Sequence, residues 1–157
     1  VDGDHTVLQV LIFLGPLLEN RGRGMIRSGI NVFNQDDDYR IPELTFVACG
    51  RERIIAPDGI RGGGPDAVIE IRSPGDESYE KFPFFAGLGV REVIVIDRDT
   101  KKPEVYRLAG PQYLAIAADR EGWVTSEVLG VRFRLLAGEK PHLAVEDFVD
   151  PSIRVEI

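Results

Sequence analysis

The sequence predicts an α/β fold in which helices flank a mixed central sheet and an antiparallel β meander follows at the C-terminus. Apolar residues between positions 5 and 20 recur at helical spacing. Residues 92–97, EVIVID, form a continuous run that is typical of a strand buried on both faces. A helical segment separates this run from an earlier β-branched segment at 66–72, which indicates a right-handed parallel crossover. Because three consecutive strands before the crossover suggest antiparallel hairpins, the sheet as a whole is mixed.

The first half of the chain begins with the helix at 5–20, which Gly15-Pro16 is expected to kink or shorten. Strands are expected at 28–33 and at 43–49, with an acidic turn between them. Residues 57–65 hold four glycines and two prolines, and this composition predicts a turn or loop rather than a domain linker.

The second half continues with the strand at 66–72, a short helix at about 77–88 and the strand at 92–97. Alternating segments then predict a meander on the edge of the same sheet. Its expected elements are strands at 104–108, 113–117, 123–128 and 131–136, followed by a last helical turn at 145–149.

The composition describes one soluble globular domain over residues 1–157. The chain is 43% hydrophobic and 29% charged, and a chain of this length buries about 68–70% of its unfolded surface. No apolar run reaches the roughly 18 residues of a membrane helix, and no signal peptide is recognisable. The single cysteine, Cys49, cannot form an internal disulfide and fits a reducing, cytoplasmic location. The chain opens on Val1 rather than Met, which is compatible with the loss of a short N-terminal segment.

The net charge argues against tight, non-specific binding of nucleic acid. Nineteen Lys and Arg residues against 26 Asp and Glu give a charge of −7, whereas tight, non-specific nucleic-acid binders present a basic surface. An enzyme whose acidic groups hold a divalent cation remains compatible with this charge, because the cation then meets the phosphate.

Several motifs that would indicate another chemistry are absent from the sequence. It has no phosphate-binding GxxxxGK[ST] loop, no GxGxxG after a strand, no HExxH and no CxxC pair, so no nucleotide cofactor is expected. The two histidines, His5 and His142, lie near opposite ends of the chain and are interpreted as surface or capping residues. What remains is a group of carboxylates on the expected strands.

The strand at 66–72 carries charged residues on one face. An alternation of period 2 places Asp66, Glu70 and Arg72 on the same side. Glu70 lies mid-strand between apolar neighbours, where an unpaired carboxylate is costly. One interpretation is a salt bridge from Glu70 to Arg72 or to Lys81, and the other is a bound metal ion.

Two further residues are expected to converge on Glu70. Glu43 begins the preceding strand, and hairpin pairing with 66–72 would bring its carboxylate close. Lys81 lies one turn into the following helix, on the side that faces the strand. Two carboxylates and a backbone carbonyl form an oxygen-only site suited to Mg²⁺ or Mn²⁺, and a nearby ammonium stabilises charge building on phosphorus. This set of groups predicts metal-assisted phosphodiester hydrolysis.

The same residues carry a likeness to a known family. A carboxylate at the start of one strand, followed by E-X-[K/R] on the next, resembles the PD-(D/E)XK nuclease superfamily. More narrowly, the sequence resembles the Uma-type family of restriction endonucleases, which was long catalogued as a domain of unknown function. The matching motifs are Arg40-Ile41-Pro42-Glu43, Pro65-Asp66…Glu70…Ser73-Pro74, Glu80-Lys81…Phe85, Gly89-Val90-Arg91-Glu92…Asp97 and Val105-Tyr106.

The resemblance implies a restriction-endonuclease-like core, a divalent metal ion and a DNA substrate. Carried over residue by residue, Glu43 and Glu70 correspond to metal ligands, although Glu43 stands where the family usually has Asp. Lys81 corresponds to the catalytic lysine, moved from the strand onto the helix. Asp66 matches a family aspartate and would add a direct or outer contact to the metal. Arg72 occupies the strand position of the superfamily lysine, where a guanidinium cannot act as a base but can clamp a phosphate.

We therefore predict a cytoplasmic DNA endonuclease that depends on Mg²⁺ or Mn²⁺, with a Glu43, Glu70 and Lys81 site and Arg72 as a second cation. A homodimer is expected, since cutting both strands requires two sites. Two rival functions remain open. The first is an inactive or weakly active nuclease-fold protein that binds DNA or a partner protein, and the second is a homodimeric assembly module that pairs through the meander at 106–133.

Three arginines near the end of the first helix are candidates for contact with the DNA backbone. The alternative interpretation of these residues is ordinary surface charge. They are Arg21, Arg23 and Arg27.

Overall fold

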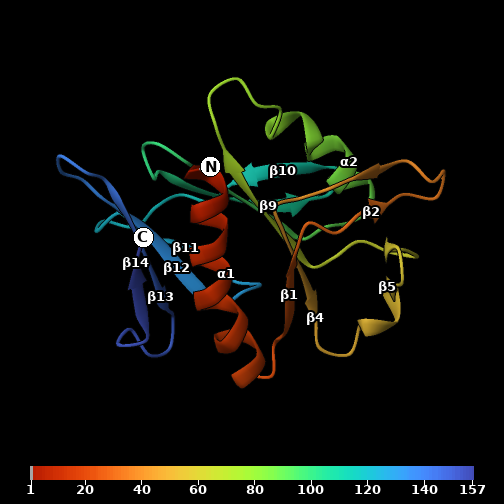
Figure 1. Ribbon diagram of the computed structural model, residues 1–157, viewed down its shortest axis with the longest axis horizontal. Helices are drawn as coiled ribbons and strands as arrows, with labels where there is room; N and C mark the ends of the chain where they lie inside the picture. The colour runs from red at the N-terminus through yellow and green to blue at the C-terminus, as the bar shows by residue number, and fades with distance from the viewer. Residues whose placement is uncertain (1) are drawn as a thin grey trace.

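A mixed six-stranded sheet forms the centre of the computed structural model, which describes residues 2–157. Its strand order is β1-β4-β7-β8-β9-β10 (Figure 1). The strands are β1 (Gly24–Ser28), β4 (Leu44–Ala48), β7 (Ala67–Arg72), β8 (Glu92–Asp97), β9 (Pro103–Ala109) and β10 (Gln112–Ala115).

Strands β7 and β8 are the one parallel pair of this sheet within the described residues, and the other neighbours are antiparallel. The crossover between them runs through a 3-10 turn, η2 (Tyr79–Lys81), and the short helix α2 (Phe82–Gly87). Both the crossover and the mixed sheet confirm the fold expected from the sequence. Pro83 lies in the first turn of α2, where its missing N–H costs no helical hydrogen bond.

The two faces of the sheet bury different helices. The long helix α1 (Asp2–Asn20) packs on one face, where Leu14 and Leu18 meet Ile69 and Ile94. On the other face Phe85 of α2 packs among valines of β7 and β8. Since side chains alternate along a strand, β7 directs odd-numbered residues towards α1 and even-numbered residues towards α2.

A small second sheet covers the β1–β4 edge on the α2 side. Its strand order is β3-β2-β6-β5, and Ile60 and Val32 pack against Val47 of β4. The 3-10 turn η1 (Glu52–Ile54) leads into it. The four strands are β2 (Val32–Phe33), β3 (Tyr39–Arg40), β5 (Ile55–Ala56) and β6 (Gly59–Ile60).

The prediction of one strand at 28–33 is wrong. Strand β1 ends at Ser28, and strand β2, which belongs to the second sheet, begins at Val32. β1 begins at Gly24, which has a φ of 147° and approaches β4 so closely that a Cβ would lie 2.2 Å from the carbonyl oxygen of Val47. Gly29, with a φ of 65°, then turns the chain out of the main sheet before β2. Gly24 and Gly29 thus mark the beginning and the end of β1.

Residues 124–156 form a separate antiparallel meander, β11-β12-β13-β14, at the left of Figure 1. Two expectations need correction here. The segments at 123–128 and 131–136 do not extend the main sheet, and the helical turn expected at 145–149 lies instead in strand β13, which pairs with β12 from His142 to Asp147. A segment of five residues is too short for its apolar spacing to distinguish helix from strand, and pairing with β12 makes residues 145–147 part of a strand. The strands are β11 (Val124–Ser126), β12 (Val131–Leu136), β13 (His142–Asp147) and β14 (Arg154–Glu156).

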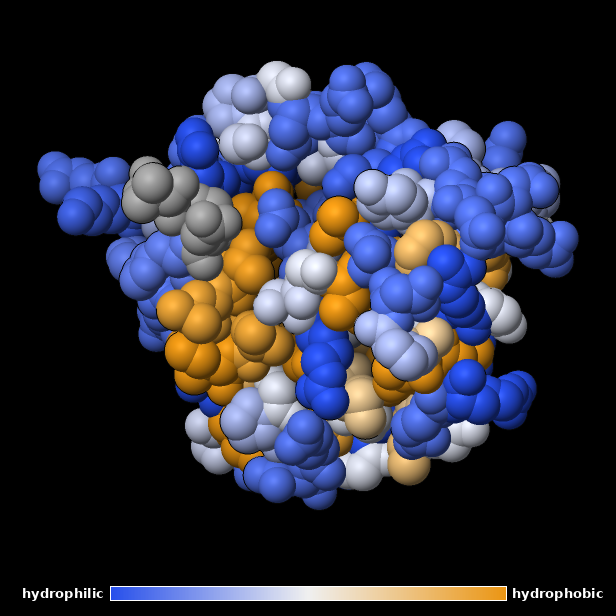
Figure 2. Space-filling model, turned by 45° about the vertical axis from the view of Figure 1, so that its right-hand side comes forward, coloured by the Kyte–Doolittle hydropathy of each residue, from blue (hydrophilic) through white to orange (hydrophobic). Residues whose placement is uncertain are grey.

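On the face shown in Figure 2, charged and polar side chains surround a hydrophobic area left of the centre and smaller ones at the centre and to its right. Within residues 2–157, no helix is both long and apolar enough to span a membrane.

Candidate functional site

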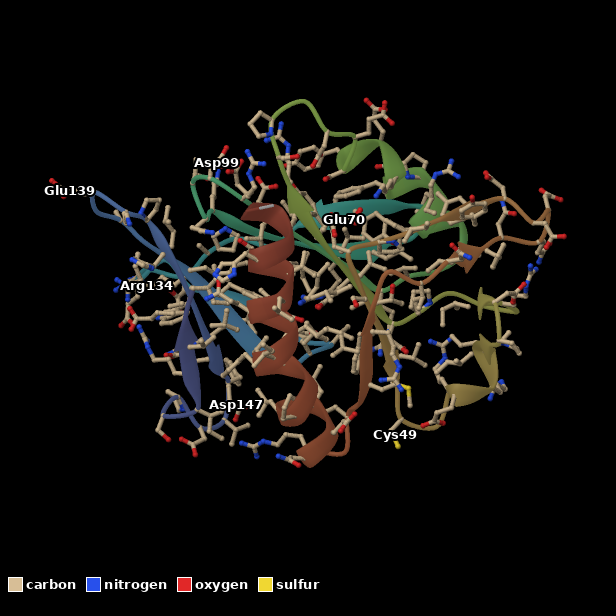
Figure 3. The ribbon with its side chains drawn as sticks, viewed as in Figure 1. Cys49, Glu70, Asp99, Arg134, Glu139 and Asp147 are labelled. Carbon is tan, nitrogen blue, oxygen red and sulfur yellow. The ribbon has the colours of Figure 1, made fainter. Side chains whose placement is uncertain are left out.

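Strand β7 carries a carboxylate into the interior on the α2 side of the sheet. Glu70 is only 1% exposed, and Figure 3 labels it among the strands of the main sheet, near α2. Its neighbours Ile69 and Ile71 face α1, while Val68 packs on the α2 side with Glu70. The period-2 prediction for this strand is therefore confirmed by its packing.

Two segments supply partners to the Glu70 carboxylate. The Nζ of Lys81, at the start of α2, donates to Oε2 at 2.8 Å. The backbone N–H of Glu43 donates to Oε1 at 3.0 Å. The structure thus brings together the three residues that the sequence grouped, although the contact from Glu43 is made by its backbone.

The electrostatics at Glu70 are dominated by burial. Loss of solvent raises the pKa of its carboxyl above the ordinary value, and the negative charge of Asp76 acts in the same direction. The ammonium of Lys81 and the N–H of Glu43 lower this pKa without cancelling the effect of burial. A buried carboxylate in this state gains from additional positive charge nearby.

Glu43 lies in the bend directly before β4 and is partly exposed. The register pairs Leu44 with Ile69, so Glu43 and Glu70 are opposite each other at the end of the antiparallel ladder. The contact that joins the two residues is the hydrogen bond from the backbone N–H of Glu43 to Oε1 of Glu70.

Arg72 follows Glu70 on the same face of β7. Its Nη1 lies 3.5 Å from Oδ2 of Asp97, and its guanidinium carbon lies 5.3 Å from the centre of the Tyr79 ring. Its Nε is buried and has no hydrogen-bond partner among the described residues. Arg72 does not contact Glu70; the salt bridge of Glu70 is with Lys81.

Asp66 is not brought into this group. Its carboxylate accepts a hydrogen bond from the N–H of Ala48 at 2.7 Å and pairs with Arg51 at 2.9 Å and Arg91 at 3.0 Å. It precedes Glu70 by four residues of extended chain, about 13 Å along the strand. Its alternation with Glu70 places it on the correct face but at the other end of β7, where two arginines and a backbone amide occupy its oxygens.

The three arginines near the first helix also separate. Arg21 pairs with Asp147 at 2.5 Å, and Figure 3 labels Asp147 near the end of α1 that lies away from Glu70. Arg23 packs its guanidinium against Gly130, where a Cβ would collide with it. Arg27 is exposed on β1 and pairs in register with Thr45, so it lies on the same face of the sheet as Glu70.

The sequence reasoning missed two groups beside the site. Asp76 accepts hydrogen bonds from Ser73 and Ser78, which fix the loop between β7 and α2 and hold its charge near Glu70. Tyr79 donates to Glu104 at 2.5 Å and covers Arg72. The Ser-Pro-Gly-Asp sequence after β7 is the signal for Asp76, because Asp side chains commonly close such turns. The position of Tyr79 depends on its contact with Glu104 of β9, which is distant in sequence.

Within residues 2–157, no three Asp, Glu, His or Cys side chains gather as a ready-made metal site. The carboxylate of Glu70 is the oxygen donor placed at this position, and Mg²⁺ sites often use one or two carboxylates when water and substrate phosphates complete the coordination. This arrangement suits a cation shared with an anionic substrate better than a permanent structural ion.

Comparison with known proteins identifies the family. The family model described as "Uma2: Putative restriction endonuclease" matches residues 3–138. The chain belongs to the Uma2 family. The resemblance noted in the sequence is thereby confirmed, and the match covers the main sheet, both helices and the first two strands of the C-terminal meander.

A solved structure supports the Uma2 fold. It is described as a putative nuclease belonging to DUF820 from Anabaena variabilis ATCC 29413, and it superposes on this chain with a TM-score of 0.65 at 16% sequence identity. The comparison covers 82% of this chain and 74% of the Anabaena chain. At this identity the likeness shows a shared fold. No curated protein matches the chain.

Proposed function

We propose that this Uma2 chain hydrolyses phosphodiester bonds in DNA, with Glu43, Glu70 and Lys81 acting together with a divalent cation. The observation that carries the proposal is the convergence of β4, β7 and α2 on one buried carboxylate. Lys81 Nζ lies 2.8 Å from Oε2 of Glu70, and the N–H of Glu43 lies 3.0 Å from Oε1. Membership of the Uma2 family supports the nuclease reaction class.

The donor set at Glu70 fits a hard cation such as Mg²⁺ or Mn²⁺. Both ions prefer oxygen ligands, and carboxylates are the commonest charged ones. Glu70 is 1% exposed and its pKa is raised by burial, so a nearby cation would stabilise its ionised form. Glu43, whose backbone N–H bonds to Glu70, would supply the second carboxylate.

A cation held by these residues would neutralise charge on the scissile phosphate and lower the pKa of a bound water. Glu43 and Glu70 would fix its position between two strands of a packed sheet, which gives a rigid site. Lys81 would place its ammonium beside the phosphate and stabilise the negative charge that builds there. Its side chain is 28% exposed, so it reaches from the buried carboxylate to the surface that a substrate approaches.

Arg72 is assigned to phosphate binding. A guanidinium remains charged at any physiological pH, so it cannot take a proton from water, but it matches phosphate oxygens in a fork geometry. The side chain is held by Asp97 and the Tyr79 ring, and its Nε remains unpartnered within the described residues. Asp66 is left out of the proposed ligand set and is assigned the role of fixing β4 against β7.

A second candidate function is a nuclease-fold protein that binds DNA or a partner without cutting. It is favoured by the net charge of −7 and by the lack, within residues 2–157, of a preformed cluster of three metal donors. In that case Lys81 serves only to offset the buried charge of Glu70. A cleavage measurement separates the two candidates.

The test compares cleavage of supercoiled plasmid DNA by the wild type and by the Glu70→Gln variant, with Mg²⁺ or Mn²⁺ present. We expect the variant to lose at least about a hundredfold in rate, because the charge stabilisation that a cation supplies is worth several kcal/mol. The matched control is Glu146→Gln, which changes an equally buried carboxylate that pairs with Arg132 and Arg154 in the C-terminal sheet. Equal rates in wild type and Glu70→Gln, or no cleavage by the wild type, would overturn the proposal.

A further inference from the structure

A separate pocket opens on the α2 side of the main sheet, between the β1–β4 edge and the β5–β6 hairpin. Its volume is about 290 Å³. Ile30, Val47, Ile55 and Ile60 contribute apolar lining, and the polar lining residues are Arg27, Asn31, Thr45 and Asp58, whose carboxylate pairs with Arg61. We call it the Thr45 pocket. Ligand sites in proteins combine a mostly apolar wall with a few polar groups in this way.

The hydroxyl of Thr45 is the unusual feature of this pocket. Thr45 is 1% exposed, and its Oγ1 has no hydrogen-bond partner among the residues that the structure describes. A buried hydroxyl without a partner is unfavourable, and a valine would fill nearly the same space without that cost. A ligand group that bonds to Oγ1 would account for a threonine at this position.

Two further polar groups lie around the pocket. Asn31 donates from Nδ2 to the carbonyl oxygen of Asp58 at 3.1 Å, which fixes the side chain and leaves Oδ1 as an acceptor. Arg27 is exposed and has no ion pair within the described part of the chain. The pocket thus offers a hydroxyl, an amide oxygen and a cation around an apolar slot, which suits a small planar ring attached to an anionic group.

The Thr45 pocket adjoins the Glu70 site on the same face of the sheet. Thr45 pairs with Val68; Glu70 lies two residues further along β7, and Glu43 lies two residues before Thr45, in the bend that precedes β4. Two residues of extended strand span roughly 7 Å. One or two nucleotides cover that distance, since successive nucleotides of a B-form strand rise about 3.4 Å.

We propose that the Thr45 pocket receives an unstacked nucleobase of the DNA strand whose phosphate lies at Glu70. Thr45 and Asn31 would hydrogen-bond to the edge of the base, and Arg27 would pair with the adjoining phosphate. Enzymes that take a base out of the stack bind it in a pocket by such edge contacts. This inference rests on the proposed function, and it adds a preference for single-stranded or locally opened DNA.

The test measures binding of the full chain to a labelled single-stranded oligodeoxynucleotide by fluorescence anisotropy, with EDTA present so that no cleavage occurs. A fully abasic strand of the same length and charge is the second probe. We expect the wild type to bind the base-containing strand about tenfold more tightly, since that factor corresponds to one well-made hydrogen bond at a buried group. The Thr45→Val variant should lose this preference while its melting temperature rises.

Thr45→Ser keeps the hydroxyl and should retain the preference for the base-containing strand. Thr125→Val, in β11 of the C-terminal sheet, should behave as the wild type. Equal affinity of the wild type for the two strands, absence of binding to either, or an intact preference in Thr45→Val would overturn the pocket proposal. Cleavage of plasmid by the wild type would in those cases leave the proposed function standing. A base preference without any cleavage would instead support the pocket and remove the nuclease.

Discussion

The ammonium of Lys81 lies 2.8 Å from the buried carboxylate of Glu70. This contact ties the start of α2, in the crossover from β7 to β8, to strand β7. The two side chains are unequally buried, with Lys81 28% exposed and Glu70 about 2% exposed. The partly exposed ammonium of Lys81 therefore compensates the buried negative charge of Glu70. The same geometry presents the amine where an anionic substrate would meet Glu70, so one contact serves both stability and the proposed chemistry.

Replacing Lys81 with Met should destabilise the fold and stop cleavage. Removing one partner of a buried pair leaves an uncompensated charge, which costs 3–5 kcal/mol when both partners are buried. Because Lys81 is partly exposed, we expect a smaller loss of about 1–3 kcal/mol at neutral pH. Urea denaturation measures it. Lys81→Arg, which keeps the charge, is the control, and an unchanged unfolding free energy in Lys81→Met would contradict the role assigned to the pair.

The pH dependence of stability should carry the signature of Glu70. Its pKa is raised in the folded state, so the native protein holds this proton more firmly than the unfolded chain. The unfolding free energy of the wild type, relative to Glu70→Gln, should thus be highest below pH 4.5 and fall as the pH rises through the folded pKa. Each unit by which the folded and unfolded pKa values of Glu70 differ corresponds to about 1.4 kcal/mol of unfolding free energy.

Subtracting the Glu70→Gln curve removes the contributions of other carboxyls. The contribution of Asp76 to the pH dependence of stability has the opposite sign, because its pKa is lowered. Burial alone would raise this pKa, but hydrogen bonds from Ser73 and Ser78 outweigh that effect. Its contribution is lost as the pH falls below 3.8. Denaturation curves at several pH values supply the measurement, and a difference curve that rises with pH would contradict the assignment of burial as the main influence on Glu70.

Asp66→Asn should separate a structural aspartate from a metal ligand. Asp66 is 3% exposed and holds Arg51, Arg91 and the N–H of Ala48. The arginine side chains are 35% and 59% exposed, so solvent screens the pairs and the expected loss is about 1–2 kcal/mol rather than that of a fully buried pair. We expect that loss in thermal or urea unfolding, together with unchanged Mn²⁺ affinity in the folded protein. A variant that folds as well as the wild type but binds Mn²⁺ more weakly would instead support Asp66 as a ligand.

The grouping of Glu43, Glu70 and Lys81 could be predicted because it depends on local rules. Strand alternation determined the face of Glu70, antiparallel pairing of β4 with β7 brought the backbone of Glu43 beside it, and the crossover helix returned Lys81 to the same side. Asp66 shows where such rules stop. Alternation gives the correct face for it, but the partners that occupy its oxygens, Arg51 and Arg91, come from segments with no local signal.

The fold shows the same limit. The apolar run at β8 has few alternatives as a strand, so its bounds agree with those expected. A helical turn is expected at 145–149 because Val145, Phe148 and Val149 recur at helical spacing, and so short a segment is ambiguous without its partner strand. Arg21 and Arg23 looked like one basic patch with Arg27, and the long-range contacts to Asp147 and Gly130 that divide them are invisible to composition.

Mn²⁺ binding tests the central claim most directly. Titration of the wild type with Mn²⁺, followed by the electron paramagnetic resonance signal of free ion, should show one bound cation per chain, with binding abolished in Glu70→Gln and weakened in Glu43→Gln. Glu146→Gln should bind as the wild type does. Folded wild type that binds no Mn²⁺ at millimolar concentration, or wild type and Glu70→Gln that bind it equally, would contradict the claim that these residues hold a metal ion.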